Sequence, residues 1–102
     1  MRQFDVLQNQ NPSTRGYAPY VVVLQSHHLE PLDTVLLAPL VNDARRSVSS
    51  VDLVIDFGGQ ALVLVLAEVA GVPKQGLSRA IGSVIDREDE IRRALDRLFT
   101  GF

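Results

Sequence analysis

Two apolar stretches separated by a Gly-Gly pair place the strongest constraint on how this chain folds. The first stretch covers residues 52–57, the second covers residues 60–66, and Gly58-Gly59 stands between them. A two-residue turn of the hand that suits paired strands requires positive φ angles, which glycine adopts without steric strain. The pattern therefore predicts a β-hairpin.

The second strand of this hairpin is apolar on both faces. Leu62, Leu64 and Leu66 alternate with Val63 and Val65, and successive side chains of a strand point to opposite faces. We expect one face to meet the interior of a sheet or barrel, and the other to be covered by a helix or by a second subunit. This strand therefore predicts a homodimer.

Three further strands are predicted before the hairpin, at residues 4–7, 20–24 and 34–37. The second of them is rich in β-branched residues and is bounded by turn formers, as a buried strand should be. Residues 8–19 hold Asn, Pro, Ser and Gly and predict a loop. Pro39 lacks an N–H group, so we expect it to force an edge, a bulge or the end of the third strand.

From Asp86 onward the pattern changes to that of an amphipathic helix. Apolar residues recur at i, i+3, i+4 and i+7 among charged ones; they are Ile91, Ala94, Leu95 and Leu98. Ser83 or Asp86 is the expected N-cap, and Gly101 is the expected end of the helix. Strands first and a helix last predict an α+β fold with a mostly antiparallel sheet.

Composition narrows the class of protein. The 102 residues fit a single domain, 1–102. Ten basic and twelve acidic residues give a net charge of −2, and no overall field that favours nucleic acid or an anionic membrane. The absence of cysteine excludes disulfides, thiolate nucleophiles and Cys-based zinc sites. Signal-peptide and membrane-span patterns are also missing, so we expect a soluble cytoplasmic protein.

The sequence holds no pattern that points to catalysis, a metal or a cofactor. His27 and His28 are adjacent, so on a strand they point to opposite faces, and no Cys or third His completes a metal site. Neither a G-x-S-x-G motif nor the spacing of a phosphate-binding loop is present. Asp52 and Asp56 share one face of a strand, which indicates a solvated face rather than an acid–base pair. We expect no catalytic residue, no metal and no cofactor.

The carboxyl-terminal end is unusually apolar. Phe99 and Phe102 stand within the last four residues, where chains are generally polar and frayed. Two interpretations stay open on this evidence. The rings either dock on the protein's own core or form an exposed apolar tip that inserts into a partner.

Short motifs spread over nearly the whole chain form an ordered series. They are Gln3-Phe4-x-Val6, Pro19-Tyr20, Gln25-Ser26, Leu37-x-Pro39-Leu40, Val72-Pro73, Arg87-x-x-x-Ile91-x-x-Ala94-Leu95-Asp96-x-Leu98 and Gly101-Phe102. No single dipeptide is specific, but their order, their spacing and the chain length together resemble the CcdB-type toxins, which belong to type II toxin–antitoxin systems.

This resemblance implies an SH3-like barrel-type, mostly antiparallel sheet with a small extra sheet and a C-terminal α-helix, in a homodimer without enzymatic activity of its own. It implies a toxin that binds the A subunit of DNA gyrase and traps its cleaved-DNA complex. A cognate CcdA-type antitoxin is the implied neutralising partner, and the two proteins together bind DNA to repress their own operon. The implied gyrase-binding positions are His28, Leu29, Asp96, Phe99, Thr100, Gly101 and Phe102.

Two alternatives stay open beside a gyrase inhibitor. The best-known member of the family has Trp where this chain has Thr100, which favours a degenerate chromosomal homologue that binds antitoxin but not gyrase. The other alternative is an mRNA endonuclease of the related toxin fold, which the acidic balance of the chain disfavours.

Overall fold

The fold is that of a computed structural model, which describes residues 1–26, 29, 31–42 and 49–101. Its elements, in chain order, are β1 (Asp5–Gln8), β2 (Tyr20–Val23), β3 (Thr34–Val41), β4 (Asp52–Phe57), β5 (Gln60–Val65), the 3-10 turn η2 (Leu66–Glu68), β6 (Ala70–Pro73), β7 (Ala80–Ser83), the 3-10 turn η3 (Ile85–Arg87) and α1 (Glu88–Thr100).

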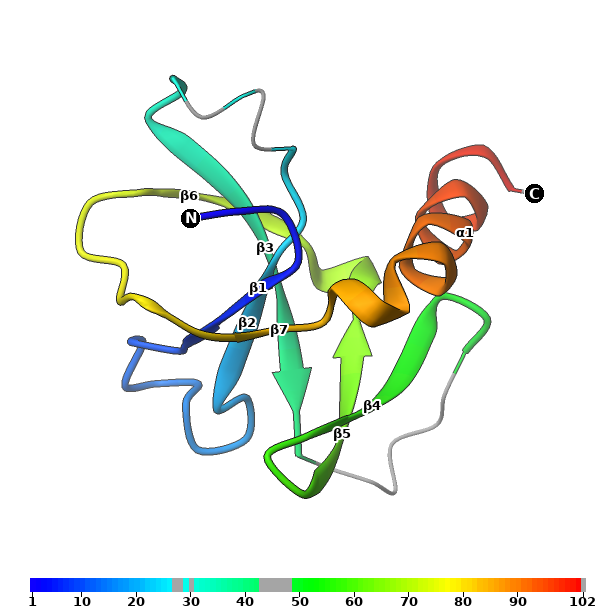
Figure 1. The fold of residues 1–102 in the computed structure, drawn as a ribbon, viewed down its shortest axis with the longest axis horizontal. Coiled ribbons are helices and arrows are strands. Elements are labelled where there is room, and N and C mark those ends of the chain that lie inside the picture. The colour runs from blue at the N-terminus through cyan, green and yellow to red at the C-terminus, as the bar shows by residue number, and fades with distance from the viewer. Residues whose placement is uncertain (27–28, 30, 43–48, 102) are drawn as a thin grey trace.

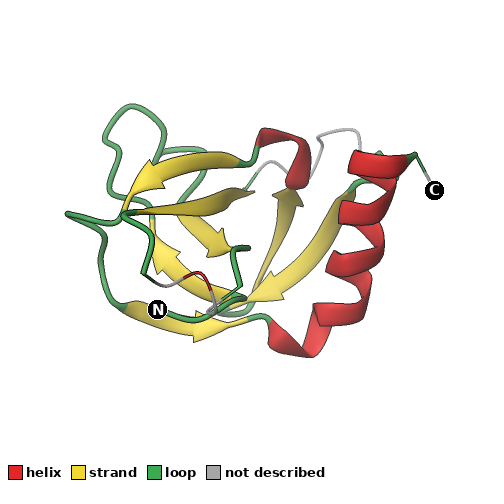
Figure 2. Ribbon diagram, turned by 90° about the horizontal axis from the view of Figure 1, so that it is seen from above, coloured by secondary structure: helices red, strands yellow, loops and turns green. Residues whose placement is uncertain are grey.

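The strands form one curled antiparallel sheet. Their order is β4-β5-β3-β2-β1-β7, and β6 branches from this path by pairing with the first half of β3. Figures 1 and 2 show the strands curving around a common interior, with α1 packed on one side. The expected α+β class, a barrel-type antiparallel sheet with a C-terminal helix, is confirmed. The expected small extra sheet is not separate, because all seven described strands belong to one sheet.

The predicted hairpin is confirmed at the predicted residues. β4 and β5 pair from Asp52 opposite Val65 to Phe57 opposite Gln60. Gly58 and Gly59 connect the strands with φ angles of 61° and 80°, in the region that a side chain disfavours and that this turn requires.

A single aromatic ring joins the two ends of the strand order. Phe57 lies at the end of β4, the first strand of the path, and Gly82 lies in β7, the last. A Cβ atom built on Gly82 would lie 2.6 Å from Cε1 of Phe57, and the same ring packs edge-on against Tyr20, with ring centroids 5.1 Å apart. The curl of the sheet therefore brings its outer strands into contact through Phe57.

Both faces of β5 are buried within the chain itself. On the face toward α1, Leu62, Leu64 and Leu66 join the main core, which also contains Ile91 and Ala94 from the helix. On the other face, a second cluster is built from Ala18, Val41, Val63 and Val65. The expectation that this second face needs a helix or another subunit is wrong, because Val63 and Val65 are already buried within the chain. Ala18 from the loop before β2 packs with them, and Val41 of the neighbouring strand β3 lies beside them, opposite Val63.

The predicted end of the third strand at residue 37 is also wrong, since β3 continues to Val41. On one side, β3 pairs with β6 over residues 34–37 and with β5 at residues 40–41. Pro39 falls in the interval between these two partners, where no ladder requires its missing N–H group. The strand therefore tolerates proline although it is internal to the sheet.

The helix begins later than predicted and without the predicted cap. Arg87 is the N-cap residue of α1, and no side chain caps this end. The Ser83 hydroxyl oxygen instead accepts a hydrogen bond from the N–H of Ile85, the first residue of the preceding turn η3, at 3.2 Å; the N-cap residue of that turn is Val84. At the other end Gly101 adopts the left-handed conformation with φ 80°, which confirms the predicted stop.

Candidate functional site

The end of α1 projects from the body of the protein as an exposed surface, which we call the helix tip: Asp96, Phe99, Thr100 and Gly101. All four residues are exposed, and the Phe99 side chain exceeds every other large hydrophobic residue of the described chain in exposure, at 70%. The interpretation that Phe99 docks on the protein's own core is therefore wrong. Phe102, the last predicted site residue, lies outside the described residues.

Local hydrogen bonds give the helix tip a defined shape. The Thr100 hydroxyl donates to the Asp96 carbonyl at 2.6 Å, and the Gly101 N–H donates to the Arg97 carbonyl at 3.0 Å. The Gly101 N–H thus continues the helical i→i−4 pattern to the C-cap residue, and the Thr100 hydroxyl adds a side-chain bond within the last turn. A Cβ atom on Gly101 would meet nothing within 4 Å, so the tip faces open space.

Arginine side chains attach α1 to the strand and turn beneath it. Arg97 donates from Nε and Nη2 to the Ser50 carbonyl, at 2.9 and 2.6 Å. Near the start of the helix, Arg87 donates from Nη1 to the Val54 carbonyl at 3.1 Å. Because Ser50 precedes β4 and Val54 lies within it, these three bonds align the helix along that strand.

Arg87 also forms a two-point ion pair with Glu90. Nε and Nη2 of Arg87 lie 2.6 and 2.8 Å from the two carboxylate oxygens. The hydrogen-bonded Glu90 carboxylate raises the pKa of Arg87, and the Arg87 guanidinium lowers the pKa of Glu90. Both groups are therefore charged at neutral pH, which keeps the Arg87 side chain oriented toward β4.

Leu29, a predicted site residue from the first third of the chain, does not lie at the helix tip. It lies in the connection between β2 and β3 and is exposed at 48%. Its N–H donates to the Ser26 carbonyl, and Gln25 donates from Nε2 to the Thr34 carbonyl at 3.1 Å. Figures 1 and 2 both show this connection well apart from α1. His28, its predicted neighbour, lies outside the described residues.

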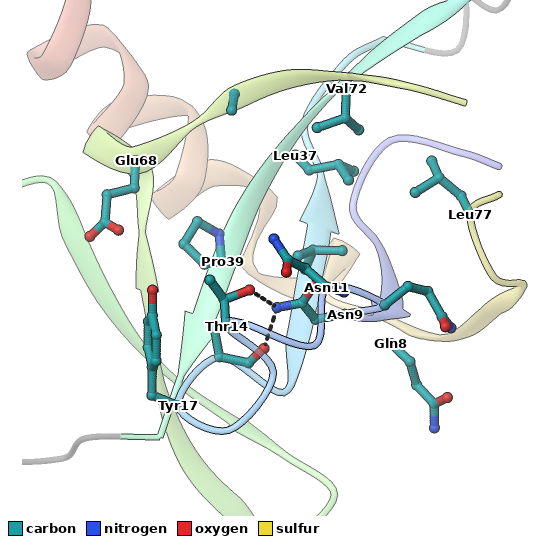
Figure 3. A pocket seen from close by; sticks show the side chains of 14 residues that line it. Gln8, Asn9, Asn11, Thr14, Tyr17, Leu37, Pro39, Glu68, Val72 and Leu77 are labelled. Carbon is teal, nitrogen blue, oxygen red and sulfur yellow. Dashed lines mark hydrogen bonds between the residues drawn. The ribbon is translucent and has the colours of Figure 1, made fainter. Parts of the chain in front are cut away.

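A pocket on the opposite face of the sheet was not predicted from the sequence. It has a volume of about 370 Å³. Apolar side chains from the sheet and the loop after β6 form its floor, and amide and hydroxyl groups surround it (Figure 3). The floor residues are Val21, Leu37, Pro39, Val72 and Leu77.

The loop between β1 and β2 supplies the polar rim of this pocket. Asn9 donates from Nδ2 to the Thr14 hydroxyl at 2.9 Å and to the Ala18 carbonyl at 2.8 Å (Figure 3). The cluster of turn-forming residues predicted this loop, but not that it folds back over the sheet. No Lys, Arg or His side chain is among the described residues that line the pocket.

Asp52 corrects a further prediction, since it is buried rather than part of a solvated face. Its carboxylate accepts a hydrogen bond from the Ser49 N–H at 3.1 Å, while its own N–H donates to the Ser49 carbonyl at 3.1 Å. Asp52 therefore closes the turn before β4. Asp56 is exposed, as predicted.

Within the described ranges, no three His, Cys, Asp or Glu side chains are arranged to hold a metal ion. Over the same residues, none of the helices has the length and apolar character that crossing a membrane requires.

Two solved structures of toxins share this fold. One, described as "Crystal structure of Mtb toxin", matches with a TM-score of 0.73 and 20% sequence identity over 92% of this chain and 99% of that chain. The other, the Mycobacterium tuberculosis toxin MazF-mt6, matches with a TM-score of 0.67 and 21% identity over 96% of each chain. At these identities the likeness establishes the fold alone. No curated protein sequence matches the chain.

The sequence model of one family, described as CcdB protein, matches residues 3–101. This match spans nearly the whole chain, so the chain belongs to the CcdB family and the resemblance found in its motifs is confirmed. Membership makes the protein a toxin and implies a toxin–antitoxin system, in which an antitoxin is its partner.

Proposed function

We propose that this toxin acts in the cytoplasm as a non-enzymatic inhibitor of DNA gyrase. In this proposal it binds the gyrase A subunit through the helix tip and stabilises the complex in which gyrase has cleaved DNA. An antitoxin neutralises it, and the two proteins together repress their operon. The observation that carries the proposal is the 70% exposure of Phe99 at the end of a well-anchored helix.

An exposed aromatic ring on an ordered element is suited to binding another protein. Burying a Phe side chain contributes about 1.5–3 kcal/mol, and aromatic residues are common among the few positions that dominate a protein interface. Gly101 adds a stretch of backbone without a side chain, which a partner can approach closely. Thr100 is smaller than the Trp at this position in the best-known member of the family, so in this chain Phe99 supplies the large apolar surface.

The proposal treats the whole chain as a single toxin domain that works as a homodimer. The family match over residues 3–101 supports a single domain. Because the second face of β5 is buried within one chain, the support for a dimer comes from family membership and not from that strand. Two copies would present two helix tips to the two A subunits of gyrase.

The endonuclease alternative receives less support. Cleavage of a phosphodiester in RNA requires positive or proton-donating groups beside the reacting phosphate. The described lining of the pocket has Glu68 and no basic residue, which suits an uncharged group better than a phosphate. Incubation of the purified protein with cellular RNA tests this alternative directly, and cleavage in the absence of gyrase would establish it.

Replacement of Phe99 tests the proposal itself. We expect Phe99→Ala to weaken binding to the gyrase A subunit by about thirtyfold, the effect of losing one dominant interface residue, and to reduce the cleaved-DNA complex in step. Gly101→Glu should abolish both the binding and the cleaved-DNA complex. Ile85→Ala is the matched control, since Ile85 is 59% exposed but lies before α1.

Wild-type affinity for gyrase in both helix-tip variants would contradict the proposal. A wild-type protein that binds its antitoxin but not gyrase would instead identify the degenerate homologue. Circular dichroism and thermal unfolding of each variant establish that the fold is intact.

A further inference from the structure

We infer that Arg97 is a positioning residue for gyrase binding, which acts by holding the helix tip in its binding orientation. This inference rests on the proposed function. Arg97 itself need not touch gyrase, because its guanidinium is directed back toward the protein, where Nε and Nη2 converge on the Ser50 carbonyl at 2.9 and 2.6 Å.

The acceptor of this bond is a fixed point of the fold. Ser50 lies in the turn between residues 49 and 52, which the buried Asp52 closes from both its carboxylate and its N–H. The Val51 N–H adds a hydrogen bond to the Ser49 hydroxyl at 3.3 Å. Asp52 then enters β4 opposite Val65, so the turn is continuous with the sheet.

The donor of this bond is part of the helix tip's own framework. The Arg97 carbonyl accepts the Gly101 N–H that ends the helix, so a single residue joins the C-terminal cap to the turn before β4. Its neighbour Leu98 packs partly buried on the core. Together these two residues fix both the tilt and the rotation of the last helical turn.

Phe99 depends on this arrangement because it has so few contacts of its own. A ring that is 70% exposed is placed by its backbone and not by packing. If the last turn frays, binding must order the tip again, and each side chain that has to be immobilised on association weakens the affinity. Loss of the Arg97 bonds should therefore weaken gyrase binding through a less ordered tip.

The sequence signal for this role is a charged residue within the apolar end of the helix. Leu95, Leu98 and Phe99 surround position 97 along the chain, and an amphipathic pattern alone assigns Arg97 to the solvent. Only the fold shows that the turn before β4 lies within its reach.

The first test compares Arg97→Ala with Arg93→Ala. Arg93 lies about one turn earlier on α1, carries the same charge, and donates no hydrogen bond to any described residue. We expect Arg97→Ala to weaken binding to the gyrase A subunit by roughly three- to tenfold, Arg97→Lys to weaken it less, and Arg93→Ala to leave it within twofold of wild type. Equal affinities for wild type and Arg97→Ala would overturn the inference.

Two further measurements separate positioning from direct contact or general stability. In free protein, the ¹⁵N order parameter of the Gly101 amide should fall in Arg97→Ala and not in Arg93→Ala. In a double-mutant cycle, Arg97→Ala should have little effect once Phe99 is replaced by Ala, because its influence passes through that ring. An unchanged order parameter, or additive effects on gyrase affinity, would each overturn the positioning role.

These outcomes also distinguish this inference from the proposed function. If Phe99→Ala and Gly101→Glu both bind gyrase as wild type does, the proposed function fails, and the positioning role for gyrase fails with it. If Phe99→Ala loses affinity while Arg97→Ala does not, only the inference about Arg97 fails.

Discussion

Gly82 should be the least replaceable glycine of the sheet, because the ring that joins the outer strands occupies the space of a side chain there. A Cβ atom at position 82 would lie 2.6 Å from Cε1 and 2.7 Å from Cζ of Phe57. Real Cβ atoms do not approach carbon so closely, and the ring cannot retreat freely because it packs against Tyr20. Gly82→Ala must therefore displace Phe57 or separate β7 from β4.

The size of the effect follows from two opposing contributions. Forcing one extra methyl group into a packed site costs about 1–3 kcal/mol, while replacing glycine in a strand recovers about 0.5–1 kcal/mol of backbone entropy. Taken at the midpoints of these two ranges, the net loss in the free energy of unfolding is about 1.25 kcal/mol, which lowers the Tm of a domain of this size by roughly 5–10 °C.

Gly71→Ala provides the matched control in urea and thermal unfolding. Gly71 is also a strand glycine, but its Cβ would meet only Cδ2 of Leu36, at 3.7 Å. We expect its unfolding midpoint to stay at or slightly above that of wild type. Phe57→Leu removes the two ring carbons in the way, so Gly82→Ala should cost much less in that background. A Gly82→Ala midpoint equal to that of Gly71→Ala would refute the account of how the sheet closes.

Two further predictions concern the helix. Ile91→Ala should lower the free energy of unfolding by about 3 kcal/mol in urea titrations, because Ile91 is fully buried in the main core. Ile85→Ala should change it by less than about 0.5 kcal/mol, and similar losses for both would contradict the assigned core. Since Arg87 lowers the folded-state pKa of Glu90, this carboxylate stabilises the fold above the ordinary pKa of glutamate, and that stability is lost as the pH falls through the lowered value. The measurement is the urea unfolding midpoint at neutral pH and at about pH 3. The fall in this midpoint should be smaller for Glu90→Gln than for wild type or Asp89→Asn. An equal fall in all three proteins would show that the ion pair contributes nothing.

The parts of the fold that could be predicted from the sequence are those that local chemistry determines. The hairpin around Gly58-Gly59 needs only positive φ angles between two apolar strands, and both strands lie where that pattern puts them. The end of α1 at Gly101 depends likewise on a single left-handed residue. In such segments the local sequence alone determines the backbone conformation.

The elements that escaped prediction depend on distant partners. β6 and β7 are four residues each and mostly exposed, with Gly71 and Gly82 inside them. Nothing in their own sequence favours a strand, and each exists because it pairs with β3 or β1. The prediction that Pro39 ends the third strand was wrong for the same reason. Its place in β3 depends on the interval between two strands that pair with β3 from one side.

The candidate site was predictable in part. The family resemblance implied that Phe99 and Leu29 belong to one binding surface. The sequence alone could not show that the β2–β3 connection and the helix tip lie apart in a single chain. The pocket beneath the β1–β2 loop was missed because its floor comes from β2, β3, β6 and the loop after β6. Such a surface exists only once non-consecutive strands have paired.

The exposure of Phe99, by contrast, follows from the phase of the helix. Successive residues of an α-helix advance by about 100°, so position 99 lies about 90° from the centre of the stripe formed by Ile91, Ala94, Leu95 and Leu98. Its nearest neighbours around the helix include Arg92, which is exposed. Turning the helix to bury Phe99 would expose Ile91, at a cost of about 1.5–3 kcal/mol, and would break the Arg97 bonds to Ser50. The ring therefore contributes little to the free energy of unfolding, so a change in gyrase affinity after Phe99→Ala measures binding and not folding.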